Sequence, residues 1–242
     1  MKLLKKTISL FINLLMPGRC YMCGKIVEGK SALCAECYSK MTFLSNQCCP
    51  VCGRPYVFPS EKEPVCQSCL KEKPKVKRLR AAFTYDTYSR ELVLPFKHAD
   101  RTDMAPFLSK LMIRAGQELI DSCDVIIPVP LHPRRLLKRK YNQAGLLGHA
   151  IATTCQKKFL PNTLLRIINT KSQGHDNRYQ RKQNVKDAFA VKKKKDIRGK
   201  KVLLIDDVYT TGATLNACAE ALYAAGAKRV EGLTLARVCR FI

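Results

Sequence analysis

Features that define several large protein classes are missing from this 242-residue chain. It has no G-x-x-x-x-G-K-[ST] phosphate loop and no G-x-G-x-x-G fingerprint after a strand, which sets aside two common nucleotide-binding motifs. Its apolar runs fall far short of the ~20 residues that a membrane-spanning helix needs. Acidic residues are scarce, with 19 Asp and Glu against 44 Lys and Arg.

The scarcity of acidic residues leaves a formal net charge of +25 at pH 7. A field of this sign favours polyanions such as nucleic acid, nucleotides, phosphosugars or an anionic membrane surface. A general solubility charge is the simpler explanation. Composition is therefore compatible with contact to nucleic acid but does not establish it.

The segment from Met1 to Met16 carries lysines followed by apolar residues, as a signal peptide does. Its apolar part is short, is interrupted by Asn13 and ends before Pro17 without a small-residue cleavage site. Helical spacing of the apolar residues predicts an amphipathic helix that docks onto a core. A role at a membrane surface is the less favoured alternative. We therefore expect a cytoplasmic protein.

Thirteen cysteines are present, and their spacing explains eight of them. Four C-x-x-C pairs combine into two quartets, which are Cys20, Cys23, Cys34 and Cys37, and then Cys49, Cys52, Cys66 and Cys69. Two such pairs supply the four thiolates of a tetrahedral structural site, so we expect two zinc ions. A disulfide framework is the alternative, and it would require an oxidising compartment. Gly24 and Gly53 each follow a pair, where a tight turn uses a permissive residue.

The segment from Val202 to Thr214 says most about chemistry. An apolar run typical of a buried parallel strand leads into Asp206 and Asp207, and a turn and a helix follow. Backbone N–H groups, hydroxyls and a helix dipole at the turn suit a phosphate. The turn residues are Thr210, Thr211, Gly212, Ala213 and Thr214. Neighbouring carboxylates suit the two hydroxyls of a ribose, because ionised carboxylates only accept hydrogen bonds. This segment predicts a sugar-phosphate site; a buried strand with an exposed acidic turn is the simpler alternative.

The same segment resembles the phosphoribosyl pyrophosphate (PRPP) signature of type I phosphoribosyltransferases along its whole length. The resemblance implies that Asp206 and Asp207 are the catalytic pair, that they bind PRPP together with the turn residues 210–214, and that Mg²⁺ accompanies it. It further implies a pyrophosphate loop formed by Pro128, Val129, Pro130, Arg134 and Arg135. A turn with solvated arginines is the alternative for that loop.

The pattern of apolar segments predicts strands that alternate with helices. Strands are expected at 81–85, 124–129, 164–168, 201–205 and 230–235, and helices at 89–98, 103–120 and 143–154 and after the signature. In that last helix Leu215, Cys218, Ala219 and Leu222 form an apolar stripe, and Gly226 ends it. This alternation predicts an α/β fold with a doubly wound parallel sheet of the type I phosphoribosyltransferase kind, preceded by a small zinc-ribbon domain.

The order of motifs over nearly the whole chain resembles the competence protein F (ComF) family. The motifs are the paired C-x-x-C sequences, the P-V-P-L strand end, the stretch around Asn142 and Gln143, the R-x-x-N-V stretch at Arg181, and the PRPP signature. The resemblance implies a cytoplasmic role in DNA uptake during natural transformation, with contact to single-stranded DNA. Where this family usually carries Gly, the present chain has Lys140.

We expect three parts: residues 1–70 as the N-terminal helix and double zinc ribbon, 71–80 as a basic linker, and 81–242 as the phosphoribosyltransferase-like domain. Arg139, Asn142 and Gln143, with Arg181 and Asn184, either order over a bound diphosphate as a mobile loop or fix loop geometry. No acceptor site is recognisable in the sequence, so the PRPP site is catalytic, regulatory or vestigial. A nucleotide salvage or biosynthetic phosphoribosyltransferase is the alternative function, and helicase or translocation proteins are alternative partners of the ribbons.

Overall fold

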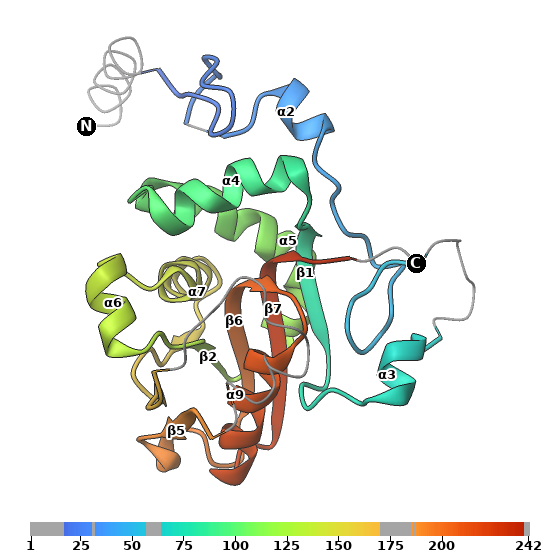
Figure 1. Cartoon of the computed structure of the whole chain (residues 1–242), viewed down its shortest axis with the longest axis vertical. Coiled ribbons are helices and arrows are strands. Elements are labelled where there is room, and N and C mark those ends of the chain that lie inside the picture. The colour runs from blue at the N-terminus through green and yellow to red at the C-terminus, as the bar shows by residue number, and fades with distance from the viewer. Residues whose placement is uncertain (1–16, 31, 57–63, 170–184, 186, 240–242) are drawn as a thin grey trace.

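A five-stranded parallel sheet lies at the centre of the protein (Figure 1). The computed structural model describes residues 17–30, 32–56, 64–169, 185 and 187–239. The strand order is β1-β7-β6-β2-β3. These strands are β1 (Leu79–Thr84), β2 (Val125–Pro128), β3 (Lys158–Phe159), β6 (Lys201–Tyr209) and β7 (Arg229–Arg237). The strands β4 (Leu164–Arg166) and β5 (Phe189–Val191) form a separate antiparallel pair.

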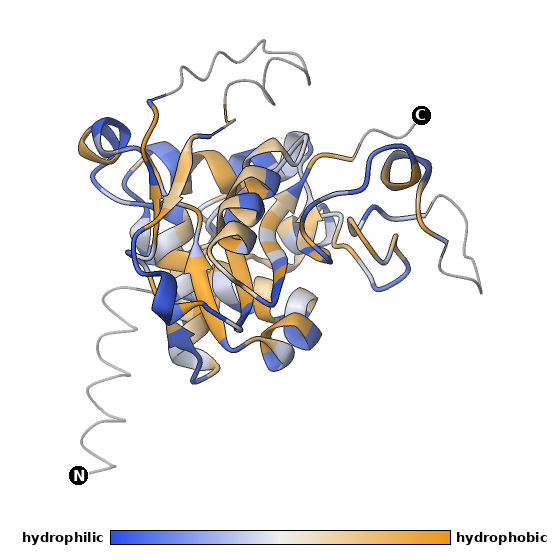
Figure 2. Ribbon diagram, turned by 90° about the horizontal axis from the view of Figure 1, so that it is seen from below, coloured by the Kyte–Doolittle hydropathy of each residue, from blue (hydrophilic) through white to orange (hydrophobic). Residues whose placement is uncertain are grey.

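Helices cover both faces of this sheet (Figure 1). The face that carries α4, α5 and α7 and the face that carries α9 are both hydrophobic, while hydrophilic segments lie outside (Figure 2). These helices are α4 (Thr87–His98), α5 (Ala105–Ser122), α7 (Gln143–Thr154) and α9 (Ala213–Ala224). Shorter elements are α2 (Ala35–Ser39), α3 (Gln67–Lys71), α6 (Pro133–Arg139), η1 (Thr102–Met104) and η2 (Lys194–Asp196).

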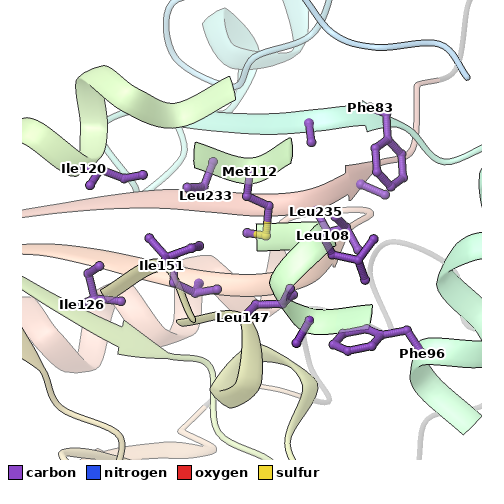
Figure 3. Close-up of a cluster of buried hydrophobic side chains, with 14 of the residues drawn as sticks. Phe83, Phe96, Leu108, Met112, Ile120, Ile126, Leu147, Ile151, Leu233 and Leu235 are labelled. Atoms are coloured by element: carbon purple, nitrogen blue, oxygen red, sulfur yellow. The ribbon is translucent and has the colours of Figure 1, made fainter. Parts of the chain in front are cut away.

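The apolar run of β6 serves two cores at once, because successive side chains of a strand point to opposite faces. Leu203 and Ile205 pack in the cluster with α4, α5 and α7, part of which is drawn in Figure 3. Val202 and Leu204 pack in the cluster with α9 and the β4–β5 pair. All four side chains are buried, which explains why this strand is a continuous apolar run instead of an alternating one.

The doubly wound parallel sheet predicted from the sequence is confirmed. The stripe of α9 is buried as expected, and Gly226 takes a φ of +94° just after the helix. The sequence pattern does not predict α6, β3 or β5, and two of the predicted strands differ in extent or pairing. The strand predicted at 164–168 ends at Arg166 and pairs with β5 outside the main sheet. The signature strand runs to Tyr209 instead of Ile205, because β7 continues to pair with it as far as Arg237.

The second cysteine quartet lies against the edge strand β1. The backbone N–H of Leu79 donates to the carbonyl of Val51 at 2.8 Å, and the Arg80 guanidinium donates to the carbonyl of Pro50 at 3.4 Å. Leu79 and Arg80 are the last two residues of the expected 71–80 linker and already belong to the sheet. No helix among the described ranges is long and apolar enough to cross a bilayer. The expected amphipathic helix at 1–16 lies outside the described residues.

We predict that Gly53→Ala destabilises the protein more than Gly24→Ala. Both glycines follow a cysteine pair with positive φ, +65° and +73°, so both substitutions pay the cost of a left-handed conformation, about 1–2 kcal/mol. Only at Gly53 would the added Cβ lie 2.6 Å from the carbonyl oxygen of Leu79, whereas Gly24 has open space around it. Urea unfolding followed by circular dichroism measures both losses. Equal losses would mean that the second quartet does not depend on close docking against β1.

Candidate functional site

Asp206 and Asp207 lie at the carboxyl end of β6, inside the strand. The backbone N–H of Asp207 donates to a carboxylate oxygen of Asp206 at 2.9 Å. Burial and the neighbouring Asp207 charge raise the pKa of Asp206 to about 7, against the opposing effects of the Asp207 N–H, Lys97 and Arg166. A carboxyl pair held in this state favours an incoming cation or hydroxyl donors, both of which stabilise the ionised form.

The signature turn joins β6 to α9 around a glycine that no other residue can replace without movement. Gly212 has a φ of +81°, and a Cβ there would lie 2.5 Å from the Tyr209 hydroxyl. The backbone N–H of Ala213 donates to the Thr211 hydroxyl at 3.4 Å. A small hollow at this turn is lined by Asp206, Thr210, Gly212, Ala213 and Thr214, among others. The first turn of α9 therefore lines this hollow, and the N–H groups at the start of a helix suit a phosphate.

A second hollow, of about 460 Å³, is mainly basic. Its lining residues are Lys97, His98, Asp100, Arg135, Lys138 and Arg139. The ammonium of Lys97 forms an ion pair of 3.0 Å with Asp207, and both side chains are largely buried. Burial lowers the pKa of His98, and Arg139 and Lys97 lower it further. The surplus of basic side chains suits this hollow to an anion.

The structure divides the predicted pyrophosphate loop between buried backbone and a helix. Pro128 ends β2, and Val129 and Pro130 after it are buried. The Val129 N–H donates to the carbonyl of Ile205 at 2.9 Å, which fixes this strand end beside the signature. Arg134 and Arg135 lie in the first turn of α6, which His132 caps by accepting the Arg134 N–H at 3.3 Å. Arg134 is exposed, whereas Arg135 lines the basic hollow, and burial lowers its pKa.

The three residues expected in a mobile loop do not behave alike. Arg139 lines the basic hollow. The Asn142 amide donates to the carbonyl of Val129 at 3.0 Å, and the buried Gln143 amide donates to the carbonyl of Lys97 at 2.9 Å. Asn142 and Gln143 therefore connect α7 to the end of β2 and to the end of α4. Arg181 and Asn184 lie outside the described residues.

Lys140 stands in a left-handed conformation with a φ of +65°, which glycine adopts at lower cost. Its ammonium pairs with Asp100 at 2.9 Å, and both groups are exposed. The pair joins the end of α6 to the loop after α4, across the basic hollow.

Sequence reasoning missed Arg166 and Lys97. Burial lowers the pKa of Arg166, and Arg135 lowers it further, while Asp206 opposes this shift, so the guanidinium lies within the field of both. It also lies over the Phe189 ring, 5.5 Å from its centroid. No sequence signal marks Arg166, because the β4–β5 pair brings it to the site. Lys97 carries a weak signal, as a basic residue in the last turn of a predicted helix.

Both cysteine quartets are assembled as the spacing predicts. The four sulfur atoms of each lie within 4.8 Å of one another. The Cys23–Cys34 and Cys52–Cys66 sulfur pairs are both 3.6 Å apart, as ligands of one tetrahedral zinc ion are. Backbone N–H groups point at sulfur, as those of Cys34 and Cys66 do toward Cys20 and Cys49 at 3.4 Å. A hydrogen bond with Cys52 is the main cause that lowers the pKa of Cys49 to about 4. The donor set therefore fits zinc.

Comparisons with known proteins agree with both halves of this description. Residues 11–70 match the double zinc ribbon domain, and residues 148–238 match the phosphoribosyl transferase domain. The DNA utilization protein YhgH of Salmonella typhimurium is 30% identical over 236 residues, which cover 93% of this chain and 99% of that protein. Competence protein F of Haemophilus influenzae is 29% identical, over 90% of this chain and 96% of that protein. The chain belongs to the ComF family.

Other members of the ComF family match over similar lengths. Competence protein ComFC of Bacillus subtilis is 28% identical over 220 residues, which cover 88% of this chain and 87% of that protein. Among solved structures, a purine phosphoribosyltransferase from Pyrococcus horikoshii aligns with 56% of this chain and 73% of that one, at 20% identity and a TM-score of 0.32. This score is too low to support the fold, which rests on the topology and the domain match.

We predict that Asp206→Asn changes how stability depends on pH. A carboxyl whose pKa rises from an ordinary ~3.9 when unfolded to about 7 when folded binds more protons in the folded chain. The free energy of unfolding that it contributes therefore falls as pH rises from about 4 to about 7. The asparagine of the variant does not titrate, so the variant does not lose stability in this way. Its free energy of unfolding, relative to that of the wild type, should therefore increase from about pH 4 to about pH 7.

Urea unfolding of both proteins from pH 5 to pH 8 measures this difference. Subtracting one curve from the other cancels the titration of groups that the two proteins share, the cysteines included. A difference that does not vary with pH would contradict the raised pKa of Asp206.

Proposed function

We propose that this ComF protein is a cytoplasmic factor of DNA uptake during natural transformation, that its phosphoribosyltransferase domain binds PRPP with Mg²⁺, and that it contacts single-stranded DNA. The observation that carries the proposal is the signature site. Asp206 borders a small hollow at the first turn of α9, Asp207 next to it pairs with Lys97, and Lys97 lines a mainly basic hollow. In this proposal residues 1–70 form the ribbon domain and 81–242 the ligand-binding domain.

The parts of PRPP match the groups at the site. Asp206 and Asp207 are the acceptors for the ribose hydroxyls, and the turn from Thr210 to Thr214 supplies N–H groups and hydroxyls for the 5-phosphate. The diphosphate would lie toward Val129 and Arg135, where the end of β2 meets the basic hollow. Bound Mg²⁺ would supply further positive charge for the diphosphate. Within the protein itself, the ammonium of Lys97 provides positive charge next to Asp207.

The metal and nucleic-acid parts of the proposal rest on different surfaces. The two quartets have the donor set and sulfur spacing for one structural zinc ion each. For DNA, five of the eight residues from Pro133 to Lys140 are Arg or Lys, and Lys138 and Lys140 are exposed. The relatives named for competence and DNA utilization support a DNA-related role. Phosphate neutralisation by such a surface needs no base-specific contact.

We predict that Asp206→Asn and Asp207→Asn each weaken PRPP binding in Mg²⁺ about tenfold or more while the protein stays folded. A hydrogen bond to a charged group contributes roughly 1.5–3 kcal/mol, which corresponds to that loss. Gly212→Val should weaken binding more, because its side chain would displace Tyr209 and the turn. Isothermal titration calorimetry measures the affinities.

Glu220→Gln is the matched control, because it removes one charge from the exposed side of α9 and should leave PRPP affinity unchanged. A wild-type protein that binds no PRPP with Mg²⁺ would refute this part of the proposal. Incubation with labelled PRPP and a panel of nucleobases tests the alternative of a salvage enzyme, since product formation would identify an acceptor.

We predict that single-stranded DNA binds with little sequence preference and with an affinity that falls steeply as salt rises. Reversing the charges of Lys138, Arg139 and Lys140 to Glu should weaken binding more than the same change at Lys193, Lys194 and Lys195, which are exposed in and before η2. Fluorescence anisotropy at several salt concentrations measures both. Equal losses would mean that only net charge matters, and no binding at low salt would refute DNA contact.

A further inference from the structure

Arg237 connects the second cysteine quartet to the signature turn. It is the last residue of β7, lies directly opposite Tyr209 of β6, and is 4% exposed. Its guanidinium donates to the carbonyl oxygen of Cys52 and, at 3.6 Å, to the Cys52 sulfur. The same guanidinium lies over the Tyr209 ring, 5.0 Å from its centroid.

Tyr209 carries this connection into the signature turn. The Tyr209 hydroxyl lies 2.5 Å from where a Cβ of Gly212 would be, so the ring supports the backbone of the turn directly. The Tyr209 carbonyl also accepts the Val238 N–H at 2.8 Å, which holds the strand end beside Arg237. A shift of the guanidinium therefore moves the ring on which Gly212 rests.

A zinc ion bound by the four thiolates of the second quartet would place net negative charge beside Arg237. A buried guanidinium requires negative charge nearby, and within the described part of the chain no carboxylate forms an ion pair with it. Four thiolates with one Zn²⁺ carry a formal charge of about −2, which supplies what Arg237 lacks. Without zinc the four cysteines lose the ion that holds them together, so the Cys52 groups that Arg237 contacts lose their fixed position.

We propose that Arg237 is a positioning residue that couples metal occupancy of the Cys49, Cys52, Cys66 and Cys69 quartet to the geometry of the signature turn. The first quartet contacts a different part of the domain: the hydroxyl of Tyr21, which lies between Cys20 and Cys23, donates to the carbonyl of Asp103 at 3.2 Å. The coupling itself does not depend on the proposed function; only the identification of the ligand as PRPP does. By linkage, a ligand at the turn must in return tighten metal binding at the second quartet.

Hydrogen exchange of the amides from Thr210 to Thr214 tests the coupling without any ligand. Cys66→Ser removes the second metal site but leaves Cys52 in place, and Cys23→Ser removes the first site. We expect faster exchange at the turn in Cys66→Ser and wild-type exchange in Cys23→Ser, with zinc content falling from two to one ion in each. Unchanged exchange after loss of the second zinc, or equal changes in both variants, would overturn the proposal.

Arg237 itself is tested by Arg237→Met and Arg237→Lys with both zinc sites loaded. Arg237→Met should speed exchange at the turn and weaken PRPP binding at least about fivefold. Arg237→Lys keeps the charge and should recover part of both. PRPP should slow zinc release to a chelator in the wild type and in Cys23→Ser, but not in Arg237→Met. Release that PRPP slows equally in Arg237→Met would overturn the proposal.

Tyr209→Leu provides a second route should Arg237→Met not fold. This variant keeps the contacts of Arg237 with Cys52 but removes the ring beneath Gly212. Zinc release should therefore be as in the wild type, whereas hydrogen exchange at the turn should no longer depend on zinc. A turn that still responds would overturn the proposal. If the wild type binds no PRPP, the proposed function fails, and the exchange measurements alone decide the coupling.

Discussion

The unequal pairing of β6 with its two neighbours determines the candidate site. On one side β7 stays paired with β6 as far as Tyr209 and Arg237. On the other side β2 stops opposite Ile205, one residue before the aspartates. Asp206 and Asp207 are therefore held rigidly by one neighbour and are open toward the gap that the other leaves. Lys97 pairs with Asp207 here, and ligands bind at the carboxyl ends of strands in open α/β sheets.

The carboxylates at this gap destabilise the folded protein when no ligand is bound. Burial beside Asp207 raises the pKa of Asp206, so the folded chain favours a proton there. Lys97 compensates Asp207, and Arg166 contributes positive charge near Asp206. A structural role alone would be served better by apolar residues at this strand end. Such a cost is typical of sites that are arranged for a ligand.

The sequence predicted the parts of the site that lie within one segment of chain. The strand, the paired aspartates and the turn at Gly212 follow each other along the chain, so local pattern was enough. The same holds for the cysteine quartets, because the spacing of their C-x-x-C pairs predicts zinc sites. Lys97 and Arg166 were missed because the contacts of α4 and of the β4–β5 pair bring them in. The end of β6 was also placed too early, since its pairing with β7 overrides the polarity of Asp206 and Asp207.

The ribbon region also covers the exposed edge of the sheet at β1. The edge strand β1 pairs only with β7 within the sheet, and an uncovered edge invites association with other chains. The Leu79 and Thr84 N–H groups donate to the carbonyls of Val51 and Thr42, and the Ala82 carbonyl accepts the Leu44 N–H. Segments with short helices thus cover this edge. The cysteine quartets give such segments a fixed shape, so metal binding and protection of the sheet depend on the same residues.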